Sequence, residues 1–130
     1  MVGHWKIKRS DGSSADVHWS KLRADADFLL GEWEESDGAK LTEIRGWCPS
    51  QQVVSAQMFG AHGQYASVSF NKVSAQKMSG RVRLFKPNGK LTMRSIEIQR
   101  VNENLAKVKL VDSADGSVVT STVTRIKAAD

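Results

Sequence analysis

The apolar period of the chain changes at Phe28-Leu29-Leu30-Gly31-Glu32-Trp33-Glu34-Glu35. Before it, residues 16–30 repeat apolar side chains at three-to-five-residue spacing, which is typical of a short amphipathic helix. Gly31 lacks a Cβ and tolerates the left-handed backbone that ends many helices. After it, Trp33 stands between two glutamates, the two-residue alternation of a half-buried strand. The sequence therefore predicts a helix over 16–30 and strands from Gly31 onward.

Turn signals divide the rest of the chain into short segments of alternating polarity. Asp37-Gly38, Pro87-Asn88-Gly89 and Asp115-Gly116 are typical hairpin turns. The connections are too short for the crossovers that parallel neighbours need, so consecutive strands are expected to pair antiparallel. The predicted strands after the helix are 31–36, 40–47, 52–59, 64–71, 77–86, 90–99, 105–111 and 117–127, and another precedes it at 3–10.

One of these strands changes its apolar phase. In strand 90–99 the apolar positions slip between Met93 and Ile96, which predicts a β-bulge near Arg94-Ser95. Eight strands are enough to close a barrel around side chains or one small ligand. We therefore expect one domain, residues 1–130, that is mainly β: an antiparallel meander of about eight or nine strands, as a barrel or a curled sheet, with one N-terminal helix.

Two Gly-x-Trp triplets carry a resemblance to known families. Gly31-Glu32-Trp33, opening an antiparallel run after a helix, resembles the first strand of lipocalin-like (calycin) barrels, most closely an uncharacterised bacterial family of such domains. In calycins this tryptophan packs across one barrel end beside a basic residue of the last strand, which implies that Gly31, Trp33 and Arg125 close the barrel. Gly3-His4-Trp5 is similar to the start of fatty-acid-binding proteins, but their Arg-x-Tyr motif would fall on Arg125-Ile126-Lys127, where lysine replaces tyrosine.

Composition narrows the class of protein. The chain has 130 residues, of which 40% are hydrophobic and 25% charged, as in a globular domain. No apolar run reaches the ~20 residues that span a bilayer, and the first residues lack a signal-peptide core. A single cysteine, Cys48, excludes an internal disulfide framework. These features predict a cytoplasmic protein with no membrane partner.

Charge is unevenly distributed along the chain. Residues 1–65 carry seven basic and nine acidic side chains, whereas residues 66–130 carry twelve basic and five acidic ones. A basic half can attract an anionic partner, although it can equally be a solvated sheet face. Binding of single-stranded nucleic acid needs aromatic residues among the cations. The basic half has only Phe70 and Phe85, so a nucleic-acid partner is not predicted.

Candidate catalytic and metal-binding residues are few. Cys48 has no evident partner that would lower its thiol pKa, and the three histidines match no metal-binding spacing. His62 lies between glycines in a predicted loop, where it could contact a ligand. Glu32 and Glu34 are expected to face solvent opposite Trp33, without the burial that acid–base chemistry needs. We therefore predict no catalytic residue, metal site or cofactor.

Aromatic and methionine side chains on the strands suggest a small hydrophobic-ligand binding protein with a cavity inside the barrel. A filled interior would instead indicate a structural or interaction module. Two other hypotheses remain: a small barrel enzyme of isomerase or cyclase type, and a basic interaction module for an anionic partner. Apolar residues on both strand phases also suggest a homodimer. The candidate ligand-binding residues are Trp33, Trp47, Met58, Tyr65, Phe70, Phe85, Met93 and His62.

Overall fold

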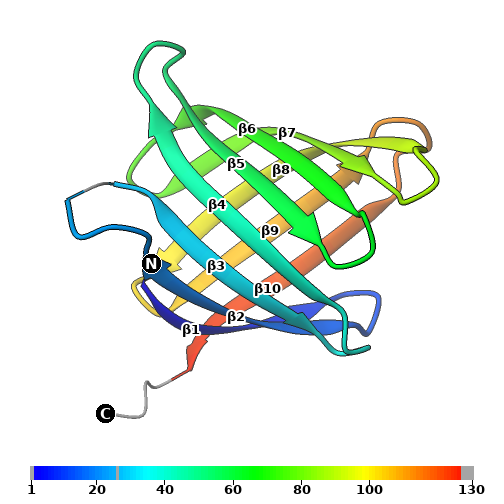
Figure 1. Cartoon of the computed structure of the whole chain (residues 1–130), viewed down its shortest axis with the longest axis horizontal. Helices are drawn as coiled ribbons and strands as arrows, with labels where there is room; N and C mark the ends of the chain where they lie inside the picture. Colours follow the sequence, from blue (N-terminus) through cyan, green and yellow to red (C-terminus); the bar gives the residue numbers. More distant parts are fainter. Residues whose placement is uncertain (1, 26, 127–130) are drawn as a thin grey trace.

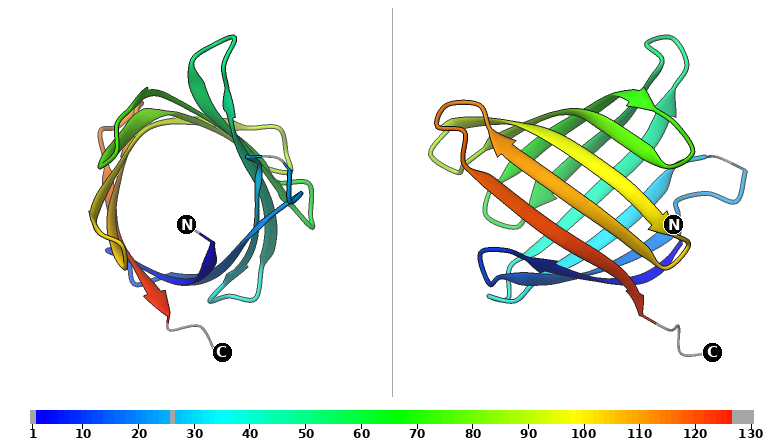
Figure 2. Two further views of the ribbon diagram at one scale, coloured as in Figure 1. Left: turned by 90° about the vertical axis from the view of Figure 1, so that its left-hand side faces the viewer. Right: turned by 180° about the vertical axis from the view of Figure 1, so that it is seen from behind.

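The computed structural model describes residues 2–25 and 27–126, and in these residues ten antiparallel strands form a closed barrel (Figure 1). Each strand pairs with its neighbours in the sequence, and β1 pairs with both β2 and β10, which closes the ring (Figure 2). The strands are β1 Gly3–Arg9, β2 Ser14–Lys21, β3 Leu29–Glu35, β4 Lys40–Cys48, β5 Val53–Gly60, β6 Tyr65–Val73, β7 Lys77–Phe85, β8 Leu91–Asn102, β9 Leu105–Asp112 and β10 Val118–Ile126.

The predicted helix over 16–30 is wrong. Residues 14–21 form β2 and residues 29–35 form β3, and none of the described residues is helical. In β2, Ala15, Val17 and Trp19 are buried and alternate with more accessible residues, a period of two. Branched and aromatic side chains on this inner face favour a strand.

The predicted count of eight or nine strands is also wrong, because β2 adds a strand where the helix was expected. The other nine strands lie where the turn signals place them, to within a few residues. Residue 26, counted in the predicted helix, and residue 127, at the end of the last predicted strand, lie outside the described residues.

The bulge predicted near Arg94-Ser95 is wrong as well. The register of β7 and β8 runs unbroken from Lys77 opposite Gln99 to Phe85 opposite Leu91. The register shifts instead between Phe70 and Lys72, where β6 meets β7, and between Arg100 and Asn102, where β8 meets β9. The apolar phase of β8 changes without a bulge, because its first apolar residues face outward and its later ones face inward.

The inner face of the barrel is packed unevenly. Buried side chains form one cluster on β1 and β2 and another on β5 and β6. On the opposite wall, the inward-facing apolar side chains of β7 to β10 are only half-buried. Val82, Ile96 and Ile98 pack against the β5–β6 cluster and Val123 packs against the β1–β2 cluster, yet each keeps part of its surface accessible. The residues concerned are Val82, Leu84, Ile96, Ile98, Val108, Leu110, Val119 and Val123.

A substitution at Gly80 tests how closely β6 and β7 approach each other. A Cβ atom at Gly80 would collide with the carbonyl oxygen of Ser69 and lie 2.7 Å from the Cα of Phe70, both rigid backbone. At Gly46 the atoms nearest to a Cβ would belong to the ring of Phe28, an exposed side chain that can move. We expect Gly80→Ala to lower the free energy of unfolding by about 1–3 kcal/mol. Urea denaturation should show a clearly smaller loss of unfolding free energy for Gly46→Ala. Equal losses for the two variants would contradict this description of the β6–β7 contact.

Candidate functional site

A buried ion pair lies on the inner face of β4. Glu43 is 1% exposed; its Oε2 accepts a hydrogen bond of 2.8 Å from Nε of Arg45 and lies 2.8 Å from Nη2 in an ion pair. Its other oxygen, Oε1, accepts a hydrogen bond of 3.2 Å from the indole Nε1 of Trp33. Both oxygens of the carboxylate are thus occupied, as a buried charge requires.

The guanidinium of Arg45 is held between two aromatic rings but is not fully hydrogen-bonded. Its central carbon lies 5.0 Å from the ring centroid of Trp19 and 5.4 Å from that of Phe70. The side chain is 11% exposed. Its Nη1 atom is buried and has no hydrogen-bond partner among the described residues. A buried donor without a partner costs about 1–3 kcal/mol, so Nη1 is a ready donor for an acceptor atom that enters the barrel.

Gly31 allows Trp19 to take this position. Gly31 lies directly across from Trp19 on one side and from Glu43 on the other. A Cβ atom at Gly31 would lie 2.8 Å from the Trp19 ring, closer than real side chains approach. The missing side chain therefore lets the indole lie across β3 and reach Arg45.

Arg125 stabilises one end of the barrel. Its guanidinium lies 4.5 Å from the ring centroid of Trp5, its cross-strand partner, and Nη1 donates a hydrogen bond of 2.7 Å to the carbonyl of Val2. The sequence predicted Trp33 as the aromatic partner. The structure places Arg125 on the tryptophan of the first Gly-x-Trp triplet, while half-buried Trp33 bonds to Glu43.

The strand register divides the candidate ligand-binding residues between the two faces. Trp33, Trp47, Met58 and Phe70 share the inner face with buried Glu43 and Ala56, although Trp47 is 47% exposed. Three others cannot line the interior, because their register partners place them on the outer face: Tyr65, Phe85 and Met93.

His62 lies in the exposed turn between β5 and β6. Glu32 is exposed on the outer face, where it accepts a hydrogen bond of 3.1 Å from Thr42. Neither residue lies buried beside a cavity, so the enzyme hypothesis gains no support. Among the residues that the structure describes, no group of three histidine, cysteine or acidic side chains could hold a metal ion.

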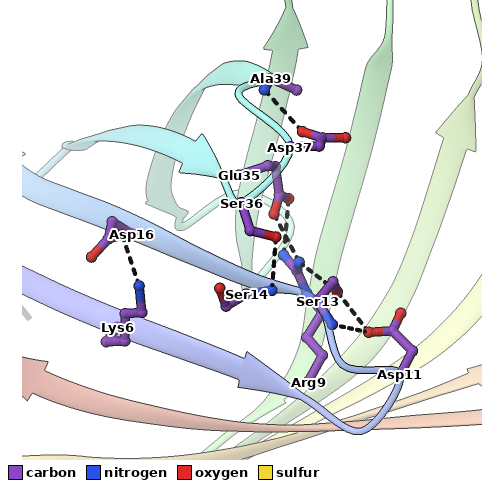
Figure 3. Close-up of polar contacts among 10 residues, drawn as sticks. All are labelled: Lys6, Arg9, Asp11, Ser13, Ser14, Asp16, Glu35, Ser36, Asp37 and Ala39. Carbon is purple, nitrogen blue, oxygen red and sulfur yellow. Dashed lines mark hydrogen bonds and ion pairs between the residues drawn. The ribbon is translucent and has the colours of Figure 1, made fainter.

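Polar contacts also join strands away from the interior pair. Arg9 and Glu35 form two hydrogen bonds of 2.8 and 2.9 Å beside the β1–β2 and β3–β4 turns (Figure 3). On the outer face, Asp16 is 2.9 Å from His4 Nε2 and 3.1 Å from Lys6 Nζ, and the His4 hydrogen bond lowers the pKa of Asp16. These pairs are partly accessible to solvent, which distinguishes them from Glu43 and Arg45.

Two adjoining hollows lie on the outer face, over β6 to β10. Their volumes are about 330 and 420 Å³, and both are lined by Glu97 and Lys109. Polar and basic side chains of the outer phase make most of their walls. Neither hollow is an enclosed apolar cavity of the kind predicted for a ligand inside the barrel.

No protein-family model matches the sequence, and comparison with the curated proteins finds no match. Among solved structures, the chain is similar to a redesigned β-barrel, mFAP1, bound to DFHBI, at 15% identity and a TM-score of 0.46, covering 95% of this chain and 94% of that one. It is also similar to EF1p2_mFAP2b bound to DFHBI, at 12% identity and a TM-score of 0.39, covering 96% and 93%. Membership of a lipocalin-like family stays a prediction. No helix among the described residues is long and apolar enough to cross a membrane.

Proposed function

We propose that the protein binds a small, mostly apolar molecule inside the barrel, with one hydrogen-bond acceptor directed at Arg45. The observation that carries this proposal is the buried Nη1 atom, which has no partner among the described residues. Protein atoms cover Nη1, so a neighbouring side chain would move aside as the ligand enters; its acceptor would then satisfy this donor and leave the hydrogen bond and ion pair between Arg45 and Glu43 in place.

The surroundings favour an apolar body for this ligand. Apolar side chains flank the guanidinium, and the half-buried inner wall of β7 to β10 offers further apolar surface. Covering that wall would remove apolar area from water, which is worth about 25 cal/mol per Å². Both the apolar body of the ligand and its acceptor atom would therefore favour binding.

Charge balance favours a neutral acceptor over an acid. Glu43 already neutralises Arg45, and both lie within the barrel. An ionised carboxylate would bring a third charge into this site, and an unbalanced buried charge carries a desolvation cost of several kcal/mol. A carbonyl oxygen would accept the same hydrogen bond without that cost, so a ketone- or ester-like group is the chemistry that fits.

Displacement of Nile red by matched nine-carbon compounds tests this proposal. Because a hydrogen bond to a charged donor contributes about 1.5–3 kcal/mol, 2-nonanone should compete about 10–150 times better than nonane. In Glu43→Gln, Arg45 is no longer neutralised, so the preference should move from 2-nonanone towards nonanoate. The control Glu43→Gln/Arg45→Met carries neither charge, so it should prefer neither 2-nonanone nor nonanoate over nonane. Equal competition by ketone and hydrocarbon in the wild-type protein would refute the proposal.

A further inference from the structure

An aromatic row crosses the outer face of β5 to β8. Phe59, Tyr65, Phe85 and Leu91 stand directly opposite one another on successive strands. The ring centroids of Phe59 and Tyr65 are 5.3 Å apart, and those of Tyr65 and Phe85 are 5.9 Å apart. Phe59 is 48% exposed and Leu91 is 44% exposed, whereas the rings of Tyr65 and Phe85 are half-buried. This aromatic row therefore presents ring surface to solvent and adds nothing to the interior.

Basic residues follow the aromatic row on the same face. Arg83 and then Arg81 stand at successive outward positions along β7, each about 7 Å from the last, two residues of strand. Lys72 and Lys109 belong to the next row across the strands. With the described residues, none of these four cations forms an ion pair within 4 Å.

One acidic side chain, Glu97, lines both hollows. Glu97 stands opposite Lys109 and is 3.4 Å from Lys77, so a single carboxylate faces five cations in this region. Short side chains beneath the cations, including Ser79 and Ser95, leave the hollow of about 330 Å³. The second hollow extends it towards Lys107. The face therefore combines one exposed and two half-buried rings, unpaired positive charge and two adjoining hollows.

We propose that this outer face binds single-stranded nucleic acid. Bases would stack on the aromatic row, because every base has a flat face that packs on an aromatic ring. The phosphates would then lie along the Arg83, Arg81 and Lys109 rows. The distance from the aromatic row to Lys109 is about 20 Å. This length gives room for about four nucleotides, the lower end of the range for a small single-strand-binding barrel.

Two other occupants fit the same surface less well. A polyanion without bases would satisfy the cations but leave the exposed rings unused. A second copy of this chain, docked about a two-fold axis, would bring the Arg81 and Arg83 patch close to its own equivalent, and like charges in contact oppose association.

The sequence did not indicate nucleic acid because Phe59 and Tyr65 precede the basic half and meet Phe85 only in the folded barrel.

Fluorescence anisotropy with fluorescein-labelled dT10 and rU10 tests the proposal. Binding should be saturable at 50 mM salt. With four phosphate contacts, the affinity should fall about 50-fold between 50 and 200 mM salt. Tyr65→Leu should weaken binding at least about fivefold, whereas Tyr65→Phe, which keeps a ring, should bind like the wild type. Arg81→Gln/Arg83→Gln should weaken it by about tenfold or more.

The control Lys21→Gln/Lys40→Gln removes the same charge from exposed lysines on β2 and β4, and should change affinity less than about twofold. Circular dichroism should show that every variant keeps its strands. The proposal is overturned if neither oligonucleotide binds, if the control loses as much affinity as the arginine variant, or if heparin binds as tightly and Tyr65→Leu has no effect. It is also overturned if light scattering finds a dimer of the 14.3 kDa chain that Tyr65→Leu dissociates.

Discussion

Glu43→Ala is expected to lower the free energy of unfolding by about 3–5 kcal/mol. The carboxylate is 1% exposed and is the hydrogen-bond partner of both Arg45 and Trp33. Its removal leaves a guanidinium buried without a counter-charge and an indole N–H without an acceptor. For a domain of this size the loss corresponds to a fall in Tm of about 10–20 °C, which thermal unfolding followed by circular dichroism would measure.

Two controls separate charge burial from simple loss of contacts. Glu35→Ala removes the partner of Arg9, whose side chain is 20% exposed and can be hydrated, so the loss should be about 1 kcal/mol. Glu43→Leu/Arg45→Met removes both charges of the buried pair and should recover most of the stability. If Glu43→Ala costs no more than Glu35→Ala, the interior pair is not desolvated in solution.

Trp19→Ala is expected to cost a similar amount, about 3–5 kcal/mol. The indole is 5% exposed, belongs to the cluster on β1 and β2, and covers one face of the Arg45 guanidinium. Its removal leaves a large space in the barrel and exposes the cation to water. Urea denaturation should show a lower midpoint and, if the barrel otherwise keeps its structure, an unchanged m-value.

A double-mutant cycle with Gly31 checks the position of this ring. In the wild-type background, Gly31→Ala should cost about 1–3 kcal/mol because its Cβ would press on the Trp19 ring. In the Trp19→Ala background the same change should cost little, giving a large coupling energy. Additive losses would mean that the indole does not lie across Gly31.

Turn chemistry made most of the fold predictable. Asp37-Gly38, Asn88-Gly89 and Asp115-Gly116 all lie in hairpin connections, and glycines 38, 89 and 116 adopt the positive φ that such turns require. The antiparallel meander followed from their spacing. The segment around β2 was wrongly predicted to be a helix because Val17, Leu29 and Leu30 also match a helical repeat. The alternation of Ala15, Val17 and Trp19 in a two-residue period was the stronger signal.

The candidate sites were harder to predict because they depend on pairing between distant strands. Glu43 and Arg45 share a strand face with Trp47, and two charged residues in an inward phase could have indicated an interior ion pair. Nothing local shows that Trp19 and Phe70 flank the arginine. The outer aromatic row is likewise invisible until β5, β6 and β7 are placed in register.

The side-chain nitrogen–proton spectrum of the arginines tests most directly whether Arg45 holds the ligand. The Arg45 signals can be assigned from their absence in Arg45→Lys. Addition of 2-nonanone to the level that displaces Nile red should shift them strongly, because Nη1 gains an acceptor, while those of Arg9 and Arg125 should stay unchanged. Unchanged Arg45 signals at that ketone concentration would contradict binding at this site.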